Sequence, residues 1–151
     1  MSYTNAEARQ DLLDIVAEAT DALAALAALG AAYELLDEAH GDDLEEKLFR
    51  PVQVAYGRAK RTHAGFAERV GLSSRPFEAA AAGAPSTGAK GFVAAAVEAV
   101  GSADVILSTL QDSMLPVEVG DRELRTGLGE VRELIGDLPA RARGVVSTLG
   151  R

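Results

Sequence analysis

Four segments of this 151-residue chain carry apolar side chains at alternating spacings of three and four residues, which is the period of an amphipathic helix. The first stripe runs from Leu12 to Leu36 and the fourth from Leu124 to Leu149. Strand-type alternation is limited to residues 116–119. The pattern therefore predicts an all-α chain. Four long helices with three connections predict an antiparallel up-down four-helix bundle.

Caps and helix breakers give the expected boundaries. Thr4 or Asn5 can cap the first helix, and Gly41 suits the left-handed position at its end. Pro51 and Pro139 lie inside the second and fourth stripes. Because both stripes keep their phase across the proline, we expect the second and fourth helices to be kinked rather than broken. The expected helices span about 5–39, 42–70, 87–115 and 121–149, in one domain over residues 1–151.

The connection 71–86 is rich in serine, glycine and proline, as expected for an irregular segment. A short helix over about 75–82 is predicted within it, since Pro76 suits a first helical turn.

Charge is distributed unevenly along the chain. Residues 1–46 hold twelve acids and one base, whereas residues 47–75 hold seven bases and one acid. We therefore expect the acidic first helix to lie beside the basic second helix.

Composition narrows the classes of function. The chain has no cysteine, which excludes disulfides, thiolate metal sites and a cysteine nucleophile. A net charge of −8 argues against a nucleic-acid partner. The N-terminal residues lack the pattern of a secretory signal, and three acids interrupt the apolar segment 91–114. We expect a cytoplasmic protein that binds neither nucleic acid nor membrane.

No metal or cofactor is predicted. A di-iron bundle needs Glu-x-x-His motifs, and the chain, whose histidines are His40 and His63, has none. The glycine-rich residues 83–91 approach the spacing of a phosphate-binding loop. Ala89 occupies the lysine position of that motif, however, and neither serine nor threonine follows Lys90.

His63, with Arg58 and Arg61, forms the candidate polar site. His63 follows the seam position Thr62, so we expect it at the edge of the bundle and partly exposed. A histidine among bases resembles the phosphoryl acceptor of histidine phosphotransfer bundles. The Arg58-x4-His63 spacing is also similar to that of HEPN-type ribonucleases, although Ala59 stands where that family usually has a polar residue. These resemblances imply a phosphotransfer or phosphate-dependent enzyme, which is the first alternative function.

The third predicted helix carries few charges to solvate an outer face. Phe92, Val97, Val105 and Ile106 lie off its main stripe and are the candidate interface residues. Exposed apolar patches usually mark association sites, so residues 71–90 or a second subunit would cover them, unless the helix is simply buried in the core of a single chain. We predict a homodimer through this helix. A non-enzymatic interaction or structural protein is the leading interpretation.

A carrier of a small apolar molecule is the second alternative. Alanines line the predicted seams, and kinks at Pro51 and Pro139 would open a cavity beside the third helix.

Overall fold

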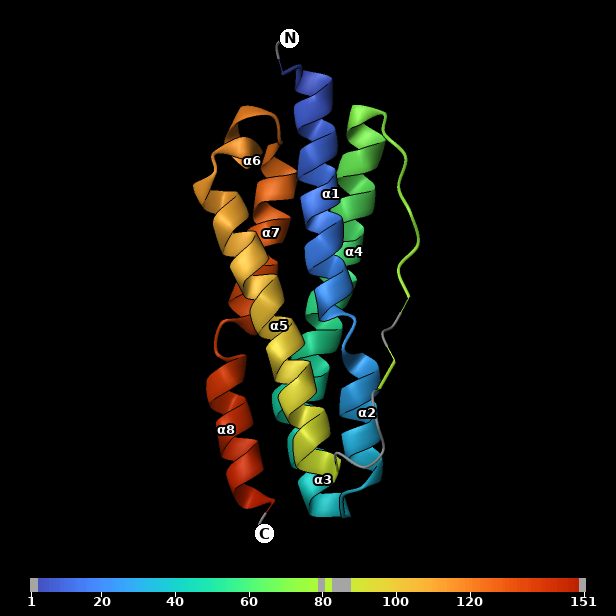
Figure 1. Ribbon diagram of the computed structural model, residues 1–151, viewed down its shortest axis with the longest axis vertical. Coiled ribbons are helices and arrows are strands. Elements are labelled where there is room, and N and C mark those ends of the chain that lie inside the picture. Colours follow the sequence, from blue (N-terminus) through green and yellow to red (C-terminus); the bar gives the residue numbers. More distant parts are fainter. Residues whose placement is uncertain (1–2, 79–80, 83–87, 150–151) are drawn as a thin grey trace.

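The computed structural model describes residues 3–78, 81–82 and 88–149. All regular secondary structure in these residues is helical, which confirms the predicted all-α class (Figure 1). The elements are α1 (Asn5–Leu23), α2 (Leu26–Glu34), α3 (Glu38–Leu44), the π-helix η1 (Glu45–Phe49), α4 (Arg50–Val70), α5 (Gly88–Asp112), α6 (Leu115–Glu118), α7 (Arg122–Ile135) and α8 (Leu138–Thr148). Five of the described helices (α1, α4, α5, α7 and α8) exceed ten residues, whereas we predicted four long helices.

The predicted first helix is divided. Thr4 caps α1 through a capping box with Glu7, as expected, but α1 ends at Leu23 and α2 begins at Leu26. The intervening Ala24 and Ala25 are buried, so packing overrides the helical propensity of alanine here. The chain leaves α2 at Glu34, five residues before the predicted end.

His40-Gly41 does not end a helix, contrary to the prediction. Asp37 caps α3 instead, accepting a hydrogen bond from the backbone N–H of His40. Gly41 is buried inside α3, where a Cβ would lie 3.1 Å from Cε2 of Tyr33. The glycine therefore serves close packing between α3 and α2 and not a left-handed cap.

Pro51 is the second residue of α4, and one residue, Arg50, separates it from the π-helix η1. Proline has no N–H to donate, which leaves the carbonyl of Lys47 without its helical partner. Nη1 of Arg141 in α8 donates to that carbonyl at 3.5 Å. The local change at Pro51 is therefore a widened turn before the proline.

The fourth predicted helix is also divided. Asp121 caps α7 as expected and accepts from the N–H of Leu124 at 2.8 Å. The helix stops at Ile135, and α8 begins at Leu138 with Pro139 in its first turn. The missing proline N–H is tolerated there, so Pro139 begins a new helix where we predicted a kink.

The connections after α4 and α5 differ from prediction as well. Residues 72–78 form no helix, and the remainder of the short helix predicted over 75–82 lies partly outside the described residues. The third predicted helix ends at Asp112, and Met114 adopts a left-handed conformation at φ 67°. Pro116 then lies in the first turn of the short helix α6.

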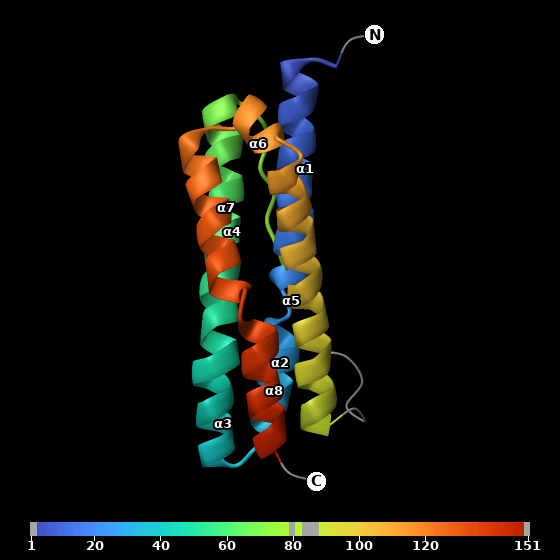
Figure 2. The same cartoon turned by 90° about the vertical axis from the view of Figure 1, so that its left-hand side faces the viewer.

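The helices form an elongated molecule whose two ends differ (Figures 1 and 2). Helices α1 and α7 lie in the half nearer the N-terminus, where α4 packs against both. Helices α2, α3 and α8 lie in the other half, and α5 runs along both. Two arginines of the basic α4 form ion pairs with α7, although α4 also lies beside the acidic α1. Arg58 pairs with Glu130, and Arg69 pairs with Asp121 and Glu123.

Candidate functional site

His63 is buried, with 3% of its surface exposed, whereas we predicted a partly exposed edge position. Its ring meets Phe77 edge-on, with 5.0 Å between ring centroids. The segment that carries Phe77 also contacts α1, through the ion pair of Arg75 with Asp21. The Nδ1 of His63 has no hydrogen-bond partner. Burial, and to a lesser extent the charge of Arg75, lower the pKa of His63 below 6.5. His63 is therefore a neutral imidazole near physiological pH.

The predicted partners of His63 lie on another face of α4. The guanidinium of Arg58 bonds Glu130 at 2.5 Å, and Arg61 is exposed. Both arginines line a cavity of about 290 Å³ between α4 and α7, which His63 does not reach. The structure thus separates the predicted histidine–arginine site into a buried imidazole and a surface groove rich in arginine.

The arginine groove includes residues that the sequence pattern did not identify. Its lining comprises Arg58, Arg61, Thr62, Arg69, Arg122, Glu123 and Thr126. Arg69 bonds Asp121 and Glu123, which raises the pKa of its guanidinium and lowers that of the Asp121 carboxyl. Among the described residues, Arg61 and Arg122 have no acidic side chain within ion-pair distance. The sequence of α7 has the pattern of an ordinary amphipathic helix and does not indicate a binding site. The groove can be recognised only once α4 and α7 are known to lie side by side.

The candidate interface residues of α5 differ in exposure. Phe92 is 5% exposed and points into the core, so it does not belong to an outer face. Val105 is 65% exposed, and Val97 and Ile106 are half-buried. By length and composition α5 could cross a membrane, and a third of its most apolar window is buried within the chain. A large part of this apolar helix is therefore uncovered in the single chain.

A wide apolar groove adjoins the uncovered face of α5. It has a volume of about 530 Å³ and runs between α5 and α8. Its lining comprises Val93, Ala94, Val97, Glu98, Pro139, Ala142, Arg143, Val146 and Ser147. The groove places Val97 beside a second apolar surface that the sequence stripe of α5 alone does not predict.

The interior beside α5 contains a small apolar void at the place where we predicted a ligand cavity. Its volume is about 10 Å³, and it is lined by Leu29, Leu48, Val52, Ala96, Val97, Val100 and Leu138. A void of this size holds about one water molecule. An apolar ligand would therefore have to separate the helices to enter.

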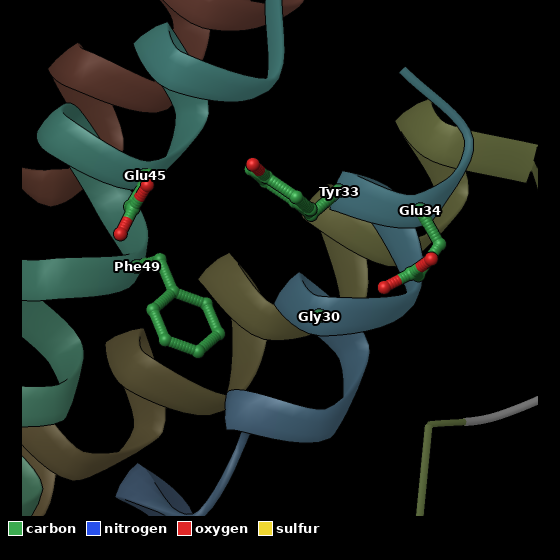
Figure 3. A pocket seen from close by; sticks show the side chains of 5 residues that line it. All are labelled: Gly30, Tyr33, Glu34, Glu45 and Phe49. Atoms are coloured by element: carbon green, nitrogen blue, oxygen red, sulfur yellow. The ribbon is translucent and has the colours of Figure 1, made fainter. Parts of the chain in front are cut away.

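A pocket of about 350 Å³ lies between α2 and η1 (Figure 3). Tyr33 and Glu34 of α2 and Glu45 and Phe49 of η1 line it, and the Tyr33 side chain extends from α2 toward η1. Gly30 forms its floor, and a Cβ there would lie 4.0 Å from Cε2 of Phe49. The pocket depends on the π-turn and on the break before α2, and neither of these was predicted from the sequence.

Within residues 3–78, 81–82 and 88–149, no group of three or more His, Asp or Glu side chains is placed to hold a metal ion. The closest association of a histidine with an acid is His40, whose Nδ1 lies 2.7 Å from Oδ1 of Asp37.

Comparisons with known proteins give no relative. No protein-family model matches the chain, no curated protein matches it, and no solved structure matches it. Function must therefore be argued from the chain's own surfaces and pockets.

Proposed function

We propose that this protein is a non-enzymatic helical module that self-associates through the outer face of α5. In this proposal the chain forms four antiparallel arms: α1 with α2, α3 through α4, α5, and α7 with α8. The α1–α2 arm contacts both α4 and α5, and so does the α7–α8 arm, which supports an up-down arrangement of the four arms. The observation that carries the self-association is the exposure of Val105 on a helix whose most apolar window is one-third buried.

Residues 72–78 of the long connection lie against α1 and α4. Arg75 pairs with Asp21 of α1 at 2.5 Å, and Phe77 packs on His63 of α4. Residues 72–78 are therefore held on the side of the molecule that α1 and α4 form. This supports a second subunit as the cover for α5.

The spacing along α5 suits a twofold axis at Gly101. A Cβ at Gly101 would meet no atom within 4 Å, so this position lies on open surface where another backbone can approach closely. Val97, Gly101 and Val105 form one row at intervals of four residues. With antiparallel α5 helices, the partner subunit's Val105 would lie opposite Val97 at the mouth of the α5–α8 groove.

A membrane is a poorer occupant for the same face. Helices that lie on membranes carry bulky apolar residues on one face and lysine or arginine on the other. The exposed side of α5 presents Glu98, Ser102 and Thr109 around Val105. The net charge of −8 also disfavours an anionic surface.

Sedimentation velocity of Val105→Lys and Val54→Lys tests the proposal. Both valines are exposed, Val54 at 48% on α4, so the two variants add the same charge to different faces. We expect the wild type and Val54→Lys to dimerise between about 1 µM and 1 mM, and Val105→Lys to stay monomeric. A monomeric wild type throughout, equal effects of the two lysines, or co-sedimentation of the wild type with phosphatidylglycerol vesicles would overturn it.

A second candidate function is anion binding in the arginine groove. Four arginines converge on one cavity, and among the described residues two of them have no acidic side chain within ion-pair distance. Arginine suits phosphate because its planar guanidinium donates two parallel hydrogen bonds. The groove supports a phosphate-dependent function without His63.

Titration with inorganic pyrophosphate, followed by nuclear magnetic resonance, tests the second candidate. The double variant Arg61→Gln, Arg122→Gln should weaken binding at least about tenfold. His63→Ala should leave binding unchanged, because His63 lies outside the groove. If His63→Ala alone removes binding, the phosphotransfer alternative is favoured instead.

A further inference from the structure

The pocket between α2 and η1 has two aromatic walls and two carboxylates (Figure 3). The ring of Tyr33 extends from α2 toward η1, and the ring of Phe49 lies across the pocket. A glycine lies beside each ring. A Cβ on Gly41 of α3 would lie 3.1 Å from Cε2 of Tyr33, so α3 approaches this ring closely. A Cβ on Gly30 would lie 4.0 Å from Cε2 of Phe49, which is an ordinary contact distance. The close approach of α3 therefore restricts the Tyr33 ring on one side.

The charge of this pocket is negative. Glu34 and Glu45 line it, and among the described residues no lysine or arginine does. Arg50 forms a long ion pair with Glu45, in which Nη2 lies 4.0 Å from Oε1, too far for a hydrogen bond. The surrounding acids, Asp37, Glu38, Asp42, Asp43 and Glu46, increase the negative potential at this end of the molecule.

We propose that this pocket binds a small organic ammonium cation. The faces of aromatic rings attract cations through their quadrupole, and the methyl groups of an alkylammonium ion also pack against them. Carboxylates at the rim supply the counter-charge. A volume of about 350 Å³ lies within the range of small-molecule sites. A bare divalent ion fits less well, because calcium needs six or more oxygen ligands and the lining offers two carboxylates and one phenol.

The π-turn explains why the site exists. Glu45 and Phe49 are the first and last residues of η1, and both line the pocket. A π-turn adds a residue to the helical turn, and such turns are frequent at functional sites. Pro51 lies two residues after the end of η1 and its backbone nitrogen cannot donate a hydrogen bond, which stabilises the widened turn relative to a regular α-helix.

Calorimetric titration with choline, and with its neutral isostere 3,3-dimethylbutan-1-ol, tests the proposal. Choline should bind with a Kd of about 0.1–1 mM, and the neutral alcohol at least about tenfold more weakly. In parallel, aromatic resonances of Tyr33 and Phe49 should shift on addition of choline, and those of Tyr3 should not.

A pair of adjacent glutamates provides the matched control. Glu45→Gln and Glu46→Gln remove the same charge from η1, but only Glu45 lines the pocket. We expect Glu45→Gln to weaken choline binding about tenfold and Glu46→Gln less than about twofold. Phe49→Leu, which keeps an apolar side chain, should weaken it about fivefold. No binding of choline at about 20 mM, equal binding of the neutral alcohol, or equal effects of the two glutamine variants would overturn the proposal.

Discussion

The two halves of the molecule differ in how regular their helices are and in how closely these helices pack (Figure 2). In the α1–α4–α7 half, long regular helices approach so closely that a Cβ on Gly127 would lie 2.2 Å from Oγ1 of Thr62. In the α2–η1–α8 half, the chain is broken at residues 24–25 and 136–137 and widened at η1. The interior void and the pocket in Figure 3 lie there. Regular helices thus close the core of the first half and leave the arginine groove at its surface, whereas the interruptions in the second half leave a void inside the core and an aromatic pocket.

The largest expected difference comes from deleting one phenylalanine in each half. Phe66 on α4 is 0% exposed, whereas Phe49 on η1 is half-buried at the pocket. Phe66→Ala should lower the free energy of unfolding by about 3–5 kcal/mol, because it leaves a cavity in a closed core. Phe49→Ala should lower it by about 1 kcal/mol, because water already reaches part of its ring. Urea unfolding of both variants measures the two losses.

Equal losses would contradict the comparison, since they would mean that Phe49 is as tightly enclosed in solution as Phe66. The slope of free energy against urea should match the wild type in both variants. A changed slope would indicate that the variant no longer unfolds in one step.

The all-α class and the main caps could be predicted from sequence, but the divisions of the helices could not. Thr4 and Asp121 cap helices as predicted because a side-chain acceptor at the N-terminus is a local property. The break at Ala24-Ala25 is not local. Residues 22–32 are almost entirely alanine and leucine, so apolar positions cover most of the helix and do not fix which face is buried.

Of the candidate sites, only the exposed face of α5 could be predicted from the sequence, because a single helix forms it. Val105 lies on the uncovered face of α5 because its position relative to the α5 stripe already places it there. His63, in contrast, is buried by Phe77, which comes from a segment with no helical period. The arginine groove needs α4 beside α7, and the aromatic pocket needs α2 beside η1. Such sites depend on pairings between segments that no single stripe specifies.

Replacing a helical glycine by alanine should change the free energy of unfolding in opposite directions in the two halves. Gly127→Ala should lower the free energy of unfolding by about 1–2 kcal/mol, because the methyl group would push α7 away from Thr62. Gly30→Ala should raise it by about 0.5–1 kcal/mol, since a Cβ there meets Phe49 at an ordinary 4.0 Å and alanine favours the helix. Thermal and urea unfolding give the sign of each change.

A third glycine separates packing from helix propensity. A Cβ on Gly129, in the same helix as Gly127, would meet no atom within 4 Å. Gly129→Ala should therefore stabilise by about 0.5–1 kcal/mol. Adding Thr62→Ala to Gly127→Ala should recover part of the loss, because it removes the hydroxyl and methyl groups that clash. If Gly127→Ala stabilises as Gly129→Ala does, α4 and α7 are not in close contact in solution.

The smallest effect is a pH dependence of opposite sign in the two halves. Burial, together with Arg75, lowers the pKa of His63 despite the opposing charges of Asp14 and Asp21. As pH falls below 6.5, the unfolded chain therefore takes up a proton before the folded one does, and stability decreases. In the other half, a hydrogen bond to Asp37 is the main cause of the raised pKa of His40, and the carbonyl of Thr148, 2.9 Å from its Nε2, adds to it. Its contribution is complete below 6.5 and is lost as pH rises through the folded-state pKa.

Single variants separate the two contributions, which oppose each other in the wild type. Relative to the wild type, His63→Leu should gain stability as pH falls from about 8 to about 5, because the unfavourable protonation linkage is gone. His40→Gln should lose stability over the same interval, because the imidazolium that donates to both Asp37 and Thr148 is absent. Urea unfolding at several pH values gives both differences. If the unfolding free energies of the two variants changed in parallel with pH, the two histidines would have similar environments. The contrast between a closed and an open half would then be wrong at these two residues.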